Sequence, residues 1–329
     1  MEFIFLILGI LVLFSVMLDF FWTALWVDSG AGPITRRLAN ITWKTLRKIS
    51  GDHPQILSLS GPIILAMTLL SWIFFLWIGW TFIFLSDPNS VAGSQFNEYA
   101  TWADKFYFTG YLVFTLGNGD FKPTNGIWQT VTILATGSGM LFITLAVTYL
   151  LSVLNAVTVK RAFAESVTGI GRTGSEVVKN TWNGKDFHNI DLTLNSYSTQ
   201  ISTLTAQHKA YPILHYYQTS HTQESLAIGL VIFDEALTIF LLGIPEDLRP
   251  NSLLLKDSRS SIDAFLDTTD LTNVRPSKYL PPDIEIDNLR ESGLPTVTND
   301  EFSFAVNGLK NRRQKLLGLL EANARQWPN

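Results

Sequence analysis

Apolar residues gather into three long runs in the first half of the chain, at residues 3–27, 62–85 and 127–158. A helix needs about 20 predominantly apolar residues to cross a membrane, so each run is long enough. The third run has 32 residues and would extend about 48 Å as a helix, against a hydrocarbon core of about 30 Å. We therefore expect three membrane-spanning helices, of which the third tilts strongly or projects into water.

The distribution of basic residues predicts how these spans are oriented. The loop between the first two runs carries Arg36, Arg37, Lys44, Arg47 and Lys48, whereas the loop at 86–126 carries only Lys105 and Lys122 among four acids. Short cytoplasmic loops are enriched in Lys and Arg. We expect a multi-pass protein of the plasma (inner) membrane, with the N-terminus outside, the loop at 86–126 outside and the chain after Lys160 in the cytoplasm.

Two further features belong to the first span and the loop that follows it. Residues 34–49 place apolar and basic side chains at helical spacing, which favours a helix at the membrane surface over a solvated linker. Asp19 is the single charge within the first run. An ionisable residue at this depth is a candidate for function, but it lies near the basic loop, and the favoured interpretation is that it reaches the interface.

Composition narrows the possible functions. Charged residues make up 16% of the chain, against roughly 25% in ordinary soluble domains, and the lipid bilayer is thus an expected partner. There are no cysteines, which excludes disulfides, a thiol nucleophile and thiolate metal sites. The net charge is −4 and the basic residues cluster near membrane ends, so no nucleic-acid surface is indicated. No catalytic constellation stands out; we predict that the protein is not an enzyme and has no cofactor.

The outer loop contains an apolar aromatic run that is too short to span. Residues 106–114 end abruptly in Gly117-Asn118-Gly119-Asp120. Such a segment at membrane depth is best explained as a re-entrant helix with an extended return, which is tolerated where its backbone faces protein or water. An ordinary β-turn is the alternative, but it leaves the run at 106–114 unexplained. We predict a pore loop at 101–123.

The end of this loop resembles the Thr-Val-Gly-Tyr-Gly-Asp signature of potassium channels, and the resemblance extends over about 62–158. It implies an ion filter in which backbone carbonyls replace the water shell of K+ or Na+. Alternate left-handed residues turn successive carbonyls inward, and Gly117 and Gly119 allow this conformation at little steric cost. One loop per chain implies a homotetramer. The predicted filter consists of Thr115, Leu116, Gly117, Asn118, Gly119 and Asp120.

The sequence departs from the family at Asn118, where an aromatic ring is usual. Losing that ring should loosen the filter, which leaves the preference for potassium over sodium open. Tyr107 and Phe108 stand where the family often has an aromatic pair, and we expect Tyr107 to hydrogen-bond Asp120 from behind the filter. Tyr111 replaces a carboxylate that some members carry.

Candidate gating residues lie in the third span. Gly137 and Gly139 predict either a hinge or close helix packing. Leu150 and Leu154 continue a stripe that contains Ile143 and Val147, which favours a hydrophobic gate or, alternatively, contact with lipid. Ser152 and Asn155 would then line the cytoplasmic mouth.

The remaining residues predict a mostly helical cytoplasmic domain. We expect three parts: 1–61 with the first span and the interfacial helix, 62–160 as the pore domain with its inner helix at 127–158, and 161–329 as the cytoplasmic domain. The Gly-x-Gly-x-x-Gly motif at 169–174 follows a helix instead of a strand, which favours a flexible linker over a dinucleotide site.

Within this domain, 192–217 and 223–244 show helical spacing. The second stretch is apolar enough for a fourth span, but Asp234 and Glu235 favour a core helix. Residues 251–298 predict an extended connection and 302–324 an amphipathic basic helix. His208, His215 and His221 lack the spacing of metal ligands, and no ligand of the domain is identified.

The sequence therefore predicts an all-α membrane protein that forms one subunit of a tetrameric, potassium-preferring cation channel. A non-selective monovalent cation channel and a non-conducting sensor or scaffold with a channel-like loop are the alternatives. A potassium-transporter subunit is a third, but such chains usually carry four pore loops.

Overall fold

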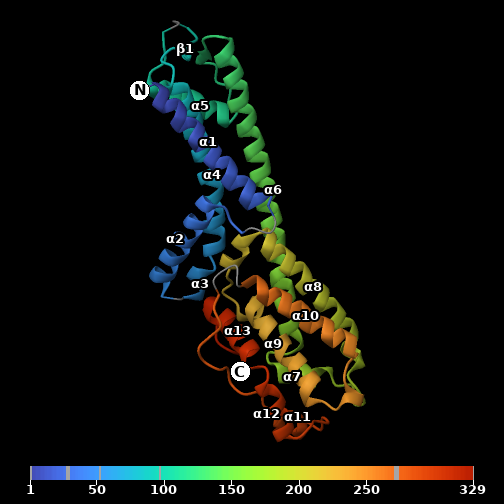
Figure 1. The fold of residues 1–329 in the computed structure, drawn as a ribbon. Coiled ribbons are helices and arrows are strands. Elements are labelled where there is room, and N and C mark those ends of the chain that lie inside the picture. Colours follow the sequence, from blue (N-terminus) through green and yellow to red (C-terminus); the bar gives the residue numbers. More distant parts are fainter. Residues whose placement is uncertain (1, 27–29, 52, 96–97, 270–273, 329) are drawn as a thin grey trace. The chain divides into compact units, whose positions relative to one another are not determined.

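The computed structural model describes residues 2–26, 30–51, 53–95, 98–269 and 274–328, so Val27 at the end of the predicted first span lies outside the described residues. The described chain is almost wholly helical (Figure 1). Its two short strands, β1 (Val91–Gly93) and β2 (Phe121–Pro123), pair antiparallel with Val91 opposite Pro123. The chain divides into two compact units, Met1–Lys44 with Pro62–Val153, and Thr45–Gly61 with Leu154–Asn329.

The first unit is built from the three predicted spans and a short helix between two of them. The spans are α1 (Glu2–Ala24), α4 (Ser60–Leu85) and α6 (Gly126–Ile170), and the short helix is α5 (Trp102–Val113). All three spans are long and apolar enough to cross a membrane. The all-α membrane fold predicted from the sequence is thus confirmed.

Asp19 joins α1 to α2 (Pro33–Ser50), the helix expected at the membrane surface. Its carboxylate accepts hydrogen bonds from the backbone of Ile34 (2.7 Å), the hydroxyl of Thr35 (2.6 Å) and the indole of Trp72 on α4 (2.8 Å). An anion at the first turn of a helix is stabilised by the free amides and the helix dipole. Asp19 is completely buried in the protein, so the expectation that it simply reaches the interface is wrong: it fixes the start of α2.

The second unit packs a bundle of helices around α9 (Leu226–Thr238), every residue of which is buried. The long helices α8 (Asp191–Ala210) and α10 (Ser252–Thr269) lie side by side (Figure 1). The shorter helices of the unit are α3 (Pro54–Leu57), α7 (Gly174–Thr181), α11 (Asp287–Glu291), α12 (Asn299–Asn307) and α13 (Lys310–Ala322).

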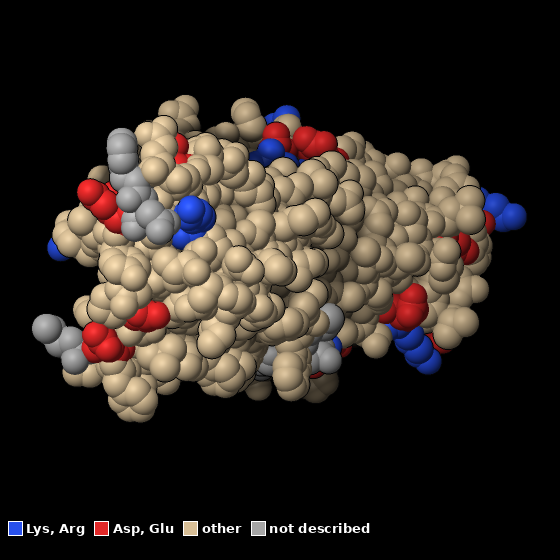
Figure 2. All heavy atoms as spheres, turned by 90° about the horizontal axis from the view of Figure 1, so that it is seen from above, with Lys and Arg blue, Asp and Glu red and all other residues tan. Residues whose placement is uncertain are grey.

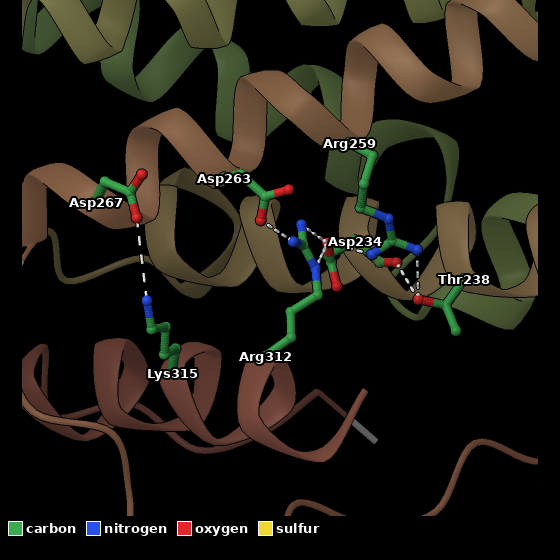
Figure 3. Close-up of polar contacts among 7 residues, drawn as sticks. All are labelled: Asp234, Thr238, Arg259, Asp263, Asp267, Arg312 and Lys315. Atoms are coloured by element: carbon green, nitrogen blue, oxygen red, sulfur yellow. Dashed lines mark hydrogen bonds and ion pairs between the residues drawn. The ribbon is translucent and has the colours of Figure 1, made fainter. Parts of the chain in front are cut away.

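Helix α9 is apolar enough to span a membrane, and it continues as a π-helical turn, η4 (Ile239–Gly243). It is nevertheless a core helix, because its acidic residues find partners inside the unit. Asp234 pairs with Arg259 of α10 at 2.7 Å and with Arg312 of α13 at 2.5 Å (Figure 3). Glu235 accepts a hydrogen bond from the indole of Trp327 at 3.1 Å. Buried charges are tolerated only when paired in this way.

Three expectations for the second half are wrong. Residues 169–174 form a tight turn and no flexible linker: α6 runs to Ile170, past the predicted end at 158, and a Cβ on Gly174 would lie 2.5 Å from Cβ of Glu235. The polar stretch 251–298 begins with the 18-residue helix α10 and is not one extended connection. The closing helix is two helices, because α12 ends at Asn307 and α13 starts at Lys310.

Candidate functional site

Helix α5 ends at the point where the predicted filter begins. Its start is fixed by a capping box in which Thr101 and Asp104 exchange hydrogen bonds with each other's backbone. At its end the chain turns sharply, since Thr115 donates to the carbonyl of Leu112 (3.1 Å) and Leu116 to that of Tyr111 (2.8 Å). The carbonyl end of a helix carries partial negative charge, which favours cations nearby.

The inner helix α6 packs closely on this turn. A Cβ on Gly139 would lie 2.2 Å from the carbonyl oxygen of Val113, so any larger residue would push α6 away from the end of α5. Gly137, in contrast, has no heavy atom within 4 Å of the corresponding position. Of the two explanations for these glycines, packing accounts for Gly139, while the hinge remains a prediction for Gly137.

The backbone of the filter segment alternates in handedness. Thr115, Gly117 and Gly119 have φ values of 56°, 63° and 81°, whereas Leu116 and Asn118 between them are not among the residues with positive φ. A positive φ in a β-branched residue such as Thr115 is strained and is found mainly where function requires it. The segment 114–120 is exposed throughout in the single chain. After the turn at Thr115 and Leu116, the segment has no regular secondary structure, and its residues are uncovered in the single chain.

Tyr107 ties together the two polar side chains of the filter. Its hydroxyl donates to the carboxylate of Asp120 at 3.0 Å and accepts from the amide of Asn118 at 2.5 Å. The first of these bonds is the one expected from the sequence. The second was not predicted from the sequence.

The other aromatic residues of α5 face away from the filter or support its return strand. Phe108 is 1% exposed and packs edge to face on Phe84 of α4, with ring centres 5.2 Å apart. Phe108 therefore anchors α5 to α4, and its support of the filter stays a prediction. The hydroxyl of Tyr111 donates to the carbonyl of Phe121 at 2.7 Å, which holds β2 against α5.

The roles of two polar residues in the outer loop, Ser94 and Lys105, were not found from the sequence. The hydroxyl of Ser94 donates to the carbonyl of Gly119 at 2.6 Å, and its backbone amide donates to that of Asp120 at 2.9 Å. Lys105, counted from the sequence as an external charge, is buried and donates to the carbonyls of Asp87 (2.6 Å) and Pro88 (3.0 Å) beyond α4. Neither role has a local pattern, since the partners are distant in sequence.

The inner helix shows three different faces. Its buried face consists of Phe142, Ala146, Tyr149 and Val153. The predicted gating stripe is partly exposed, with Leu154 at 44%, and lies on a second face. A third face carries Thr144, Thr148, Ser152 and Asn155, spaced four, four and three residues apart. Gly137 falls on this polar face as well, about 120° around the helix from the gating stripe.

Thr144 and Thr148 were missed in the sequence, although their spacing on an apolar helix was a usable signal. Both are exposed in the single chain, and their hydroxyls donate only to the carbonyls four residues before them, at 2.8 and 3.0 Å. Hydroxyls bonded in this way keep lone pairs for a further partner. The face is thus polar, unlike a surface that contacts lipid alone.

Charged side chains are sparse on the face seen from above, where they form small patches on an otherwise uncharged surface (Figure 2). Two of the four acids in the loop at 86–126 have structural partners: Asp87 accepts from the indole of Trp128 at 2.8 Å, and Asp104 belongs to the capping box of α5. Asp120 remains at the filter itself, where it accepts from Tyr107.

Two histidines of the second unit, His208 and His215, pack against other side chains. Nδ1 of His208 donates to the carbonyl of Leu204 at 2.9 Å, and its ring meets Phe265 edge to face. Burial lowers the pKa of His208 to about 3 and that of His215 to about 4, with the charge of Lys160 acting in the same direction. Both rings are therefore neutral at physiological pH. Among the described residues, no group of three or more metal-ligating side chains is brought together.

Comparison with known proteins agrees with this arrangement. A family described as ion channel matches residues 67–156, which include most of α4, all of α5, the filter segment and much of α6. Over 324 residues the chain is 51% identical to the uncharacterized membrane protein YdjJ of Bacillus subtilis (strain 168), and the match covers 98% of this chain and 95% of that relative. No solved structure matches the chain. The chain thus belongs to the same family as that membrane protein, and its core is an ion channel of the potassium-channel superfamily.

Proposed function

We propose that the chain is the pore-forming subunit of a homotetrameric cation channel that prefers potassium. Four copies of the segment 115–119 would surround one axis and coordinate K+ through their backbone carbonyls. The observation that carries this proposal is the alternation of positive φ at Thr115, Gly117 and Gly119 with the opposite sign at the residues between them. Alternate handedness turns successive carbonyls of one strand toward the same side.

The exposure of the filter segment supports the tetramer. A strand with its polar backbone uncovered at membrane depth is unstable unless it faces other subunits or water. Leu116 is 64% exposed and Tyr107 43% exposed in the single chain, and neighbouring copies would cover them. One loop per chain requires four chains to close a ring of carbonyls.

We infer that the polar face of α6 lines the water-filled cavity below the filter. Thr144, Thr148 and Asn155 would offer oxygens to hydrated cations there. The hydrophobic gate at Leu150 and Leu154 stays a prediction, since these residues lie on another face of the helix. The basic helix α2 would rest on the cytoplasmic surface of the plasma membrane, which places the N-terminus outside and the second unit in the cytoplasm.

Purified protein in planar lipid bilayers tests the proposal. With potassium on one side and sodium on the other, we expect single-channel currents whose reversal potential reports preference for potassium. Gly117→Ala should abolish the current, because alanine is strained at a φ of 63°. Gly126→Ala is the matched control, since Gly126 has ordinary φ and open space around it. No current from the natural protein, or a monomer by mass measurement in lipid, would contradict the proposal.

A further inference from the structure

A buried lysine, Lys160, lies on α6 just after the predicted span at 127–158. Lys160 is 8% exposed, and its ammonium donates to the carbonyls of Leu214 (3.0 Å) and Tyr217 (2.8 Å). The ion pairs found among the described residues do not include it. Burying an ammonium costs free energy unless it has hydrogen-bond partners. The two hydrogen bonds therefore fix Lys160 and the segment that contains the two carbonyls relative to each other.

The carbonyls belong to a short segment that also contacts the start of α4. We call it the joint segment; it comprises the 3-10 helix η2 (Pro212–Tyr216) and Tyr217. The hydroxyl of Ser60 donates to the carbonyl of Tyr216 at 2.7 Å. The ring of Tyr217 lies against Gly61, where a Cβ would be 2.5 Å from Cγ of the ring. The joint segment is thus bound to the first residues of the outer helix and to the inner helix together.

On its other side the joint segment is continuous with the helical bundle. Helix α8 ends at Ala210, and Tyr211 still donates to the carbonyl of Gln207 at 2.8 Å, which leads directly into η2. Immediately after the segment, the amide of Gln218 donates to the side chain of Asn323 at 2.9 Å, just past the end of α13. A displacement of α8 or α13 must therefore move the joint segment.

We propose that the joint segment transmits the state of the helical bundle to the pore, by holding the inner helix through Lys160 and the outer helix through Ser60 and Gly61. This proposal rests on the proposed function, because it describes how movement of the helical bundle would open or close that channel. Helices α4 and α6 are continuous from these contacts into the pore domain. A displacement at either contact therefore moves the whole helix. Lys160 is a positioning residue and has no contact with the permeant ion.

Two variants break the joint on different helices. Lys160→Met removes the ammonium while keeping a long side chain. Ser60→Ala removes the hydroxyl that lies within hydrogen-bond distance of the carbonyls of both Leu57 and Tyr216, with little effect on packing. Full-length protein in planar bilayers should show open probabilities changed by about fivefold or more, the usual range of coupling between sites. Unitary conductance and the reversal potential should stay as in the natural protein, because the filter is untouched. Since both act through one segment, their effects should not multiply in the double variant.

Matched controls and a second measurement keep the test decisive. Lys209→Met removes an exposed lysine of α8, and Gly169→Ala changes a glycine with open space around it; neither should alter open probability. Hydrogen exchange over 212–217 should rise in Lys160→Met and Ser60→Ala. If hydrogen exchange over 212–217 rises but the open probability does not change, the proposed coupling is refuted. It is also refuted if neither hydrogen exchange nor open probability changes. If the natural protein never conducts, the proposed function is contradicted instead. If the coupling proposal alone is wrong, the natural protein and all variants conduct with the same open probability.

Discussion

The amide of Asn118 donates a hydrogen bond of 2.5 Å to the hydroxyl of Tyr107. This bond replaces, within one subunit, part of the support that an aromatic ring at position 118 would give. A hydrogen bond contributes about 1 kcal/mol net, whereas a buried ring covers about 150 to 250 Å² of surface. Position 118 of the predicted filter thus makes a polar contact with α5 in place of a packed aromatic ring.

Tyr107→Phe tests whether that contact sets selectivity. The variant keeps the ring but removes the hydroxyl that accepts from Asn118 and donates to Asp120. A filter with less support collapses more easily around the smaller ion, so we expect the permeability ratio of potassium to sodium to fall several-fold. The reversal potential under opposed potassium and sodium measures it. Tyr99→Phe, at an exposed tyrosine of the outer loop, is the control, and equal ratios in both variants would refute the role of Tyr107.

Asn118→Tyr makes the opposite change. If the new ring fits beside Tyr107, it restores buried aromatic surface behind the filter, and we expect sodium permeation to decrease. The same reversal-potential measurement applies. Should the natural protein already exclude sodium and the variant behave identically, the carbonyls of 115–118 alone set the selectivity and the supporting side chains do not.

Gly139→Ala and Gly137→Ala separate packing from hinge bending in α6. The methyl group on residue 139 would meet the carbonyl of Val113 at 2.2 Å, so we expect a lower melting temperature and loss of the tetramer on gel filtration. Residue 137 has open space, and alanine there favours the straight helix by about 1 kcal/mol. Gly137→Ala should keep the tetramer and alter open probability. Equal stability of both variants would contradict the packing role of Gly139.

The ion pairs of α13 differ in burial, and their removal should differ in cost. Arg312→Met leaves the carboxylate of Asp234 buried with one partner fewer (Figure 3), and breaking such a pair costs roughly 3 to 5 kcal/mol. Lys315→Met removes an exposed contact of 4.0 Å to Asp267, which we expect to cost less than about 1 kcal/mol. Urea unfolding followed by circular dichroism measures both, and similar midpoints would show that the Asp234 network does not hold α13 to the bundle.

Acid should weaken the second unit through its packed histidines. Their pKa values of about 3 for His208 and about 4 for His215 lie below the unfolded value of 6.5. The unfolded chain therefore binds more protons, so the stabilisation is complete above pH 6.5 and is lost as the pH falls toward 4. Each histidine contributes at most about 1.4 kcal/mol per pH unit.

Thermal unfolding at pH 7.5 and 5.5 checks this expectation. His208→Gln and His215→Gln should each reduce the difference in melting temperature between the two conditions. His221→Gln, at an exposed position, should leave the difference unchanged. If His208→Gln and His215→Gln leave the difference in melting temperature as it is in the natural protein, the two histidines are not kept neutral by the fold.

The sequence by itself determined the three spans, the short helix in the outer loop and the core character of α9, while the pore loop at 101–123 stays a prediction. The apolar runs at 3–27, 62–85 and 127–158 and the shorter run at 106–114 reflect the thickness of the bilayer, a constraint that acts on each segment alone. The pair Asp234-Glu235 in an apolar helix likewise has one low-energy solution, a protein interior with basic partners.

Tertiary structure alone decided the roles that depend on contacts between distant segments. The sequence showed a charge at Asp19 but not that Ile34, Thr35 and Trp72 surround it, and it showed glycine at 139 but not the carbonyl that requires it. It also misjudged 169–174, because the same glycines serve a mobile linker or a tight helix turn, and only the packing against α9 selects between them. Local pattern fixes which residues are buried or exposed, whereas pairing is set by the free energy of the whole chain.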